Sequence, residues 1–224
     1  MIELKETAYK WIDENEKSII EWSDKAWEFA ELGLLEFKTS KYLSGIAEKH
    51  GFKVDRGVAE MPTAFVGTWS NGKGPTLGIL GELDALAGIS QKAVPYKEPI
   101  KEGAPGHGCG HNIYGTSGMA GAIALKMAME KANIPGTIKF YGCPAEESHG
   151  GKVFMVRDGL FDGVDACLSH HPWPSNSAGL CSGNAMNSVK FEFYGAASHA
   201  AMSPHLGISA LDAVELMNMG ERPS

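Results

Sequence analysis

The residues of this chain that are best suited to chemistry begin with a thiol and an imidazole inside a glycine-rich stretch, GHGCGHN at positions 106–112. Cys109 and His111 are two positions apart, and the glycines around them let both side chains converge on one point without steric interference. By itself, a Cys-x-His pair also fits a tight loop with a buried thiol and a surface histidine. Its interpretation therefore depends on the other reactive residues of the chain.

Further acidic and imidazole side chains each lie just beyond an apolar, strand-like run: Asp84, Glu146, Glu147, His170 and His171. Considered singly, paired glutamates are commonly a solvated turn and paired histidines a surface feature. Together with the Cys-x-His pair, however, they offer thiolate, imidazole and carboxylate donors, which suit zinc, manganese or a similar divalent ion. A donor set this large could hold two metal ions. Two adjacent carboxylates also allow one to bind metal while the other takes a proton from water.

The elements that must position these residues are strands alternating with helices. We expect strands over residues 64–69, 76–80, 136–142 and 164–168, and helices over residues 4–30, 40–50, 115–131 and 151–158. The turn at 70–72 is typical of a hairpin joining the first two strands. The alternation predicts an α/β layered fold with a largely parallel sheet, in which ligands bind beyond the carboxyl ends of the strands. All of the candidate residues can then face one crevice.

Composition limits the class of protein. The 224 residues are 43% hydrophobic, enough for one sizeable core, and the formal net charge is -7 with no basic run. We therefore expect neither a nucleic-acid nor a membrane partner. The N-terminus lacks an apolar leader segment, and no apolar run is long enough to cross a bilayer, so we expect a cytoplasmic protein. Cys143, Cys167 and Cys181 are expected to be reduced, buried thiols.

Four motifs, in this order, resemble those of metallopeptidase family 20, subfamily D, the two-metal amidohydrolases and aminoacylases: ELDAL at 82–86, HGCGHN at 107–112, PAEE at 144–147 and HP at 171–172. The resemblance covers nearly the whole chain. It implies a layered, zinc-peptidase-like catalytic domain over residues 1–184, with a mixed, largely parallel sheet. Residues 187–194 alternate like a strand and 208–219 have helical periodicity, which resembles the start of the family's smaller α+β lid and dimerisation domain, here 185–224.

The metal ligands implied by the resemblance are Cys109, His111, Glu147 and His171. Glu146 takes the place of the general base. Of the adjacent histidines, His171 is preferred to His170 because it directly precedes a proline, as the ligand does in similar sequences. Asp84 matches an acid behind the metal ligands that orients one of them, and a helix or loop cap is its structural alternative.

The activity implied by the resemblance is metal-dependent hydrolysis of the amide bond of N-acyl or N-aroyl amino acids or dipeptide-like substrates. Two divalent ions, zinc or manganese, would assist it, and a homodimer is the expected assembly if the lid domain is complete. His199 of the lid matches a histidine that reaches the neighbouring subunit's active site and stabilises the oxyanion. A capping histidine within a loop is the alternative for His199.

Other functions stay open. Relatives continue past the length of this chain to a last metal-binding histidine, and the helical pattern here breaks off at 220–224, so we expect a C-terminally truncated chain. The alternative function is thus an inactive remnant or a non-catalytic partner of a full-length relative. A cysteine nucleophile, Cys109 activated by His111, leaves the glutamate pair and His171 unexplained. A Rossmann-type nucleotide site is disfavoured because the glycines around Cys109 do not follow a strand at the required spacing.

Overall fold

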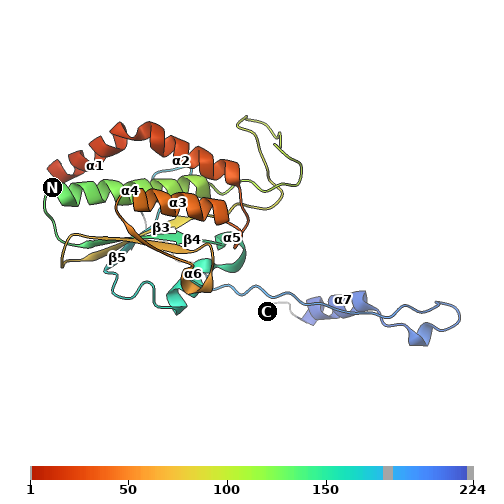
Figure 1. Cartoon of the computed structure of the whole chain (residues 1–224). Coiled ribbons are helices and arrows are strands. Elements are labelled where there is room, and N and C mark those ends of the chain that lie inside the picture. The colour runs from red at the N-terminus through yellow and green to blue at the C-terminus, as the bar shows by residue number, and fades with distance from the viewer. Residues whose placement is uncertain (1, 179–183, 221–224) are drawn as a thin grey trace. The chain divides into compact units, whose positions relative to one another are not determined.

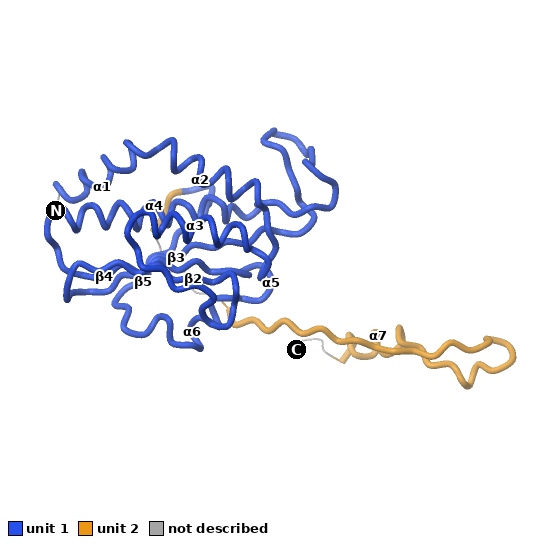
Figure 2. The backbone as a smooth tube through the Cα atoms, viewed as in Figure 1, with its two compact units in different colours: residues 1–175 blue, residues 176–224 orange. Residues whose placement is uncertain are grey.

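The computed structural model describes residues 2–178 and 184–220. These fall into two units, Met1–Ser175 and Asn176–Ser224, which are coloured separately in Figure 2. Every residue that the sequence predicts to bind metal belongs to the first unit. The boundary predicted between residues 184 and 185 stays a prediction.

The first unit is built on a five-stranded mixed sheet of order β1-β2-β4-β3-β5. Its strands are β1 (Lys53–Arg56), β2 (Phe65–Ser70), β3 (Thr76–Glu82), β4 (Thr137–Cys143) and β5 (Ala166–Leu168). β3 pairs in parallel with both β4 and β5, whereas β2 is antiparallel to β1 and β4. The α/β layered fold predicted from the sequence is confirmed. Its parallel part consists of the three strands whose ends carry the predicted site residues.

Helices cover one face of this sheet in two tiers (Figure 1): α1 (Ile2–Glu14), α2 (Glu16–Phe29), α3 (Phe37–Lys49) and α4 (His111–Lys131). The inner tier, α3 and α4, contacts the strands, and α1 and α2 pack on α4. The short elements η1 (Val58–Glu60), α5 (Glu146–His149) and α6 (Gly151–Arg157) complete the unit. The inner helices are thus held between the sheet and an outer helical layer.

The two-residue period of the strands divides the core into two clusters. Within β4, Phe140 packs with Phe65 on the side of the helices. Its neighbour Tyr141 faces the opposite side and packs with Met155 of α6. Cys143 belongs to this second cluster and is fully buried, as predicted.

The hairpin predicted at residues 70–72 is wrong, because β4 lies between β2 and β3. The start of β4 is hydrogen-bonded to both arms of the turn: Asn71 N donates to Gly136 O at 2.8 Å, and Thr137 N donates to Pro75 O at 2.9 Å. A turn reverses the chain so that the strands on either side of it run antiparallel, but it does not exclude a third strand from entering between them. The insertion places the ends of β3 and β4 next to each other.

Several predicted boundaries are also corrected. The region 4–30 forms two helices that meet at Asn15, and α4 begins at His111 rather than at residue 115. β1 and α5 were not predicted. Cys167 is exposed, because β5 is an edge strand whose residues are open to solvent. Cys181 lies outside the described residues.

The second unit contains η2 (Pro204–Leu206) and α7 (Ala210–Gly220). The helix predicted over 208–219 is therefore present, displaced by a residue or two. The strand predicted over 187–194 is not formed in the described residues, where the nearest ladder contact is a single bridge between Ala196 and Ile208. Alternation alone does not make a strand without a partner for its backbone groups.

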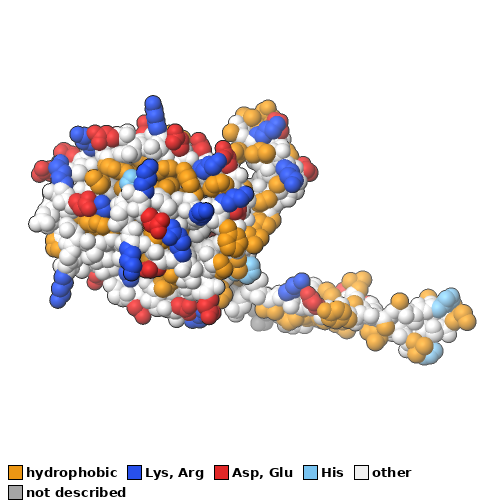
Figure 3. All heavy atoms as spheres, in the orientation of Figure 1, with side chains coloured by type: hydrophobic (Ala, Val, Ile, Leu, Met, Phe, Trp, Pro, Cys, Tyr) orange, Lys and Arg blue, Asp and Glu red, His pale blue; other side chains and the backbone are white. Residues whose placement is uncertain are grey.

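The surface seen in Figure 3 carries basic and acidic side chains interspersed over α1, α2 and α3. This face therefore presents mixed charge rather than a field of one sign. Among the described residues, no helix combines the length and the apolar character required to span a bilayer.

Candidate metal centre

The predicted site residues converge at the carboxyl ends of the parallel strands. Asp84 follows β3, the pair Glu146-Glu147 follows β4 as the start of α5, and His171 follows β5. Because these strands are parallel neighbours, their ends meet at one edge of the sheet. Residues 107–110 cross this edge and place Cys109 beside the first residue of α4.

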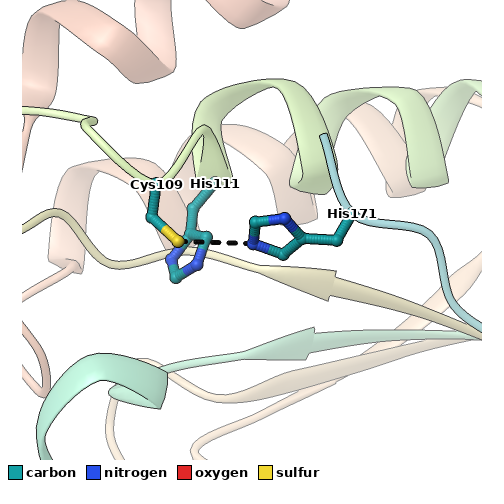
Figure 4. A group of neighbouring side chains, drawn as sticks. All are labelled: Cys109, His111 and His171. Carbon is teal, nitrogen blue, oxygen red and sulfur yellow. Dashed lines mark hydrogen bonds between the residues drawn. The ribbon is translucent and has the colours of Figure 1, made fainter. Parts of the chain in front are cut away.

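Three of the predicted ligands face one another (Figure 4). Cys109 Sγ lies 3.3 Å from His171 Nε2, and the His111 and His171 rings meet edge to face with centroids 5.8 Å apart. One donor atom from each of these three residues lies within 4.8 Å of the other two. Gly110 allows this approach: its φ of 81° turns the chain between the thiol and the helix, a conformation that a side chain would disfavour.

Asp84 fixes the orientation of His111. His111 Nδ1 lies 2.9 Å from the Asp84 carbonyl oxygen and 3.2 Å from Asp84 Oδ1, while Asp84 Oδ2 accepts a hydrogen bond from Glu147 N at 2.9 Å. Burial acts to raise the pKa of Asp84, but the hydrogen bonds from His111 and the Glu147 backbone hold it below its usual value. With Nδ1 directed at Asp84, His111 presents Nε2 to the centre of the site.

Glu82 is a residue of this site to which the sequence analysis gave no role. Its side chain is 8% exposed, and one carboxylate oxygen pairs with Lys152. The other, Oε2, lies 2.9 Å from His111 Nε2. Glu82 precedes Asp84 by two residues, the period at which side chains of an extended chain point the same way, and this spacing was the available signal.

The carboxylates of the site alter the pKa values of His111 and Cys109. Burial acts to lower the pKa of His111, but the Asp84 and Glu82 carboxylates outweigh it and raise the pKa to about 10. For Cys109, burial and the Glu147 carboxylate raise the pKa to about 12. Metal binding to these groups must therefore displace protons, as is general for thiol and imidazole ligands.

The adjacent glutamates differ in exposure. The Glu146 side chain is 41% exposed and the Glu147 side chain 23%, and each places a carboxylate oxygen 3.8–3.9 Å from His111 Nε2. Burial raises the pKa of Glu146, and the nearby Glu82 carboxylate adds to this effect. A raised pKa brings a carboxylate closer to the range in which it can exchange a proton with water.

A buried carboxylate holds the turn that carries these glutamates. Ala145 has a φ of 55°, which directs α5 back toward the site. Its backbone N donates to Glu36 Oε1 at 2.8 Å, and Thr63 Oγ1 donates to Glu36 Oε2 at 2.7 Å. Glu36 is completely buried, so these donors stabilise a charge that would otherwise be costly inside the protein.

The remaining histidines have other contacts. His170 Nε2 is 2.9 Å from Ser117 Oγ of α4. His149 Nδ1 contacts the neighbouring Ser148 Oγ at 2.8 Å. In the second unit, His199 Nδ1 accepts hydrogen bonds from the backbone N of Ala201 and Met202, each at 3.2 Å. That local contact is the capping arrangement considered above, and a catalytic role for His199 stays a prediction.

The donor set fits a divalent ion. Sulfur, imidazole nitrogen and carboxylate oxygen are the ligands that zinc and manganese take in proteins. His111 Nε2 and Glu82 Oε2 are buried and have no hydrogen-bond partner in the structure, and an ion would satisfy both. Within the described residues, two groups of side chains could hold an ion. One consists of Cys109, His111 and His171, and the other of Glu82, His111 and Glu146.

Comparison with known sequences gives the same class of protein. The pattern of Peptidase family M20/M25/M40 matches residues 78–222, and the chain belongs to this family. A similar relative is the B subunit of p-aminobenzoyl-glutamate hydrolase from Escherichia coli (strain K12), 43% identical over 219 residues, which cover 95% of this chain and 45% of the relative. The run GELDALAG at 81–88 and the HP pair at 171–172 are the features of the sequence that point to this hydrolase. That resemblance is confirmed.

More distant relatives agree on the fold. The Xaa-Arg dipeptidase of Mus musculus is 35% identical over 164 residues, covering 70% of this chain and 34% of that protein. A crystal structure of a dinuclear metal-binding peptidase of the M20 family from Bacillus subtilis superposes with a TM-score of 0.60 at 24% identity, covering 70% of this chain and 43% of that chain. The chain thus spans about half the length, or less, of the relatives it matches.

Proposed function

We propose that this chain forms the metal-binding part of a hydrolase that cleaves the amide bond of N-acyl or N-aroyl amino acids or dipeptide-like substrates, of the p-aminobenzoyl-glutamate type. The observation that carries the proposal is the convergence of Cys109, His111 and His171, with donor atoms within 4.8 Å of one another. The similarity to the E. coli p-aminobenzoyl-glutamate hydrolase supports the choice of substrate class.

The proposed ligands are Cys109, His111, Glu147 and His171, which would hold two divalent ions, zinc or manganese. When bound, such ions polarise a carbonyl group and lower the pKa of a water molecule. Asp84 keeps the His111 lone pair directed into the site, and Glu36 keeps the turn of α5 in place.

Glu146 is proposed as the general base. It takes a proton from the attacking water and passes it to the departing amine nitrogen, so that the amide C–N bond breaks with a neutral leaving group. Its partial exposure and raised pKa support this role. His199 is proposed to stabilise the oxyanion in a neighbouring subunit.

Substitution of the base tests the assignment. Glu146→Ala is expected to reduce turnover of p-aminobenzoyl-glutamate by about 10²–10⁴-fold, the usual contribution of general-base catalysis, while metal content stays native. Glu98→Ala, which removes an exposed glutamate paired with Lys92, is the control and should leave turnover unchanged. Loss of metal in Glu146→Ala, or native turnover, would contradict the role.

The assembly is a separate proposal. The family resemblance favours a homodimer formed through residues 185–224, whereas the E. coli relative is named as one subunit of a hydrolase, which favours association with a different subunit. Light scattering on the purified chain measures self-association. An amide-hydrolysis assay on the chain alone and mixed with a full-length relative tests whether it is active or is a non-catalytic partner.

A further inference from the structure

The end of β3 holds a buried carboxylate that the proposed ligand set does not use. Glu82 is 7% exposed, and its Oε2 atom has no hydrogen-bond partner. A buried carboxylate oxygen is costly unless a positive group lies beside it, so what this oxygen faces decides its role.

The atom that Glu82 Oε2 faces is also without a hydrogen-bond partner. His111 is 1% exposed, and its Nε2 lies 2.9 Å from Glu82 Oε2. The contact is an ion pair when Nε2 carries a proton. An ion that takes the place of this proton would contact both atoms.

The separation of these atoms is compatible with a shared ion. Nitrogen and oxygen ligands lie roughly 2.0–2.2 Å from zinc or manganese, so two of them at about a right angle on one ion are about 3 Å apart. The proposed base, Glu146, lies beside this pair, since one donor atom from each of Glu82, His111 and Glu146 lies within 4.8 Å of the other two.

Lys152 of α6 prepares Glu82 for this role. Its ammonium group pairs with Glu82 Oε1 and leaves Oε2 free. The carboxylate is thus held in one orientation by a cation at its other oxygen.

We propose that Glu82 is a metal ligand that shares one ion with His111, and that Cys109 and His171 belong to the second ion. An imidazole nitrogen binds a single ion, and assigning His111 to the ion at Glu82 leaves Cys109 and His171 for the second ion. The position at Glu82 is rich in oxygen and suits a harder ion such as Mn²⁺, while the position at Cys109 suits Zn²⁺. This inference rests on the proposed two-metal hydrolase site.

The test is metal stoichiometry rather than activity. We compare the native 224-residue chain with Glu82→Gln and Glu48→Gln. Each protein is stripped of metal and incubated with Mn²⁺ and Zn²⁺, and its metal content is measured by elemental analysis. The affinity for Mn²⁺ is measured by calorimetry. Glu48, an exposed glutamate paired with Arg56, is the matched control for removing a charge from an ion pair. We expect about two ions per chain in the native protein and in Glu48→Gln. In Glu82→Gln we expect about one ion, with the retained ion zinc and Mn²⁺ binding at least tenfold weaker.

The outcomes separate this inference from the proposed function. Two ions with native Mn²⁺ affinity in Glu82→Gln would overturn the inference and leave the metal site intact, with Glu82 only a partner of Lys152. A native chain that takes up no metal would overturn both. If Glu82→Gln does not fold, Glu82→Asp keeps the charge beside Lys152 but withdraws the oxygen from His111, and the same loss of one ion is expected.

Discussion

His111 connects the buried and exposed parts of the site. Its ring is 1% exposed, yet Nε2 lies within 4 Å of carboxylate oxygens of Glu82, Glu146 and Glu147. The hydrogen bond to Asp84 decides which of its two nitrogens faces those groups. A ligand held in one tautomer and one rotamer loses little entropy on binding an ion, so we expect Asp84 to contribute to metal affinity without contacting the ion.

Asp84→Asn should therefore weaken metal binding by about 10–100-fold, the usual effect of changing a group that orients a metal-bound histidine. The amide must direct its NH₂ group either at His111 Nδ1 or at Glu147 N. In either case one hydrogen-bond donor faces another donor, and one hydrogen bond is lost. Competition with a chelator of known affinity measures the change. Asp55→Asn, on the exposed strand β1, is the control. Equal affinities in both variants would mean that Asp84 only caps the backbone of Glu147.

Among the elements, α4 determines how closely His111 approaches the end of β3. Glycines allow the helix to lie directly on β3: a Cβ at Gly115 would come within 2.8 Å of Glu82 O, and one at Gly118 within 2.9 Å of Leu80 O. Gly121, one turn further along, has no atom within 4 Å of such a position. The close contact at the N-terminal half of α4 is what brings His111 to the end of β3.

Alanine at two of these glycines should have opposite effects. Gly121→Ala should stabilise the protein by about 1 kcal/mol, because alanine has the higher helix propensity and the site is open. Gly118→Ala gains the same propensity but forces the helix away from β3, and we expect a net destabilisation of about 1–3 kcal/mol. Urea unfolding of both variants measures the difference. Stabilisation in both would show that the contact between α4 and β3 adjusts without cost.

For the whole molecule, the relevant fact is that the candidate metal residues belong to one unit. Glu82, Cys109, His111 and His171 lie within Met1–Ser175, which has its own core on both faces of the sheet. His199 belongs to the other unit. Metal binding and a contribution of His199 to catalysis are thus separable properties.

A chain of residues 1–175 should bind the same number of ions as the 224-residue chain. Because the ions bind only the folded state, metal at about 100 times its Kd should stabilise either chain by about 2.7 kcal/mol per ion, and a chelator should reverse this. Elemental analysis and thermal unfolding with and without Mn²⁺ give both quantities. A lower metal content in the shorter chain would show that residues beyond 175 contribute a ligand.

Part of the site could be predicted because its residues follow strands. The positions of Asp84, Glu146 and His171 after apolar runs were visible from composition and period, and a parallel arrangement places such positions together. Glu82 also lies beyond the strand predicted over residues 76–80, but no role was predicted for it. Its partners Lys152 and His111 are distant in sequence, and their proximity depends on how α6 and α4 pack on the sheet.

The family, the α/β class and the kinds of donor atom could be predicted before folding was considered, since motifs, periodicity and residue chemistry are local properties of a chain. The folded structure was needed to establish that β4 enters between β2 and β3, that Cys167 is exposed on an edge strand, and that Glu82 faces His111. These follow from pairings between segments far apart in the chain, whose free energy depends on the packing of the whole unit rather than on any one stretch.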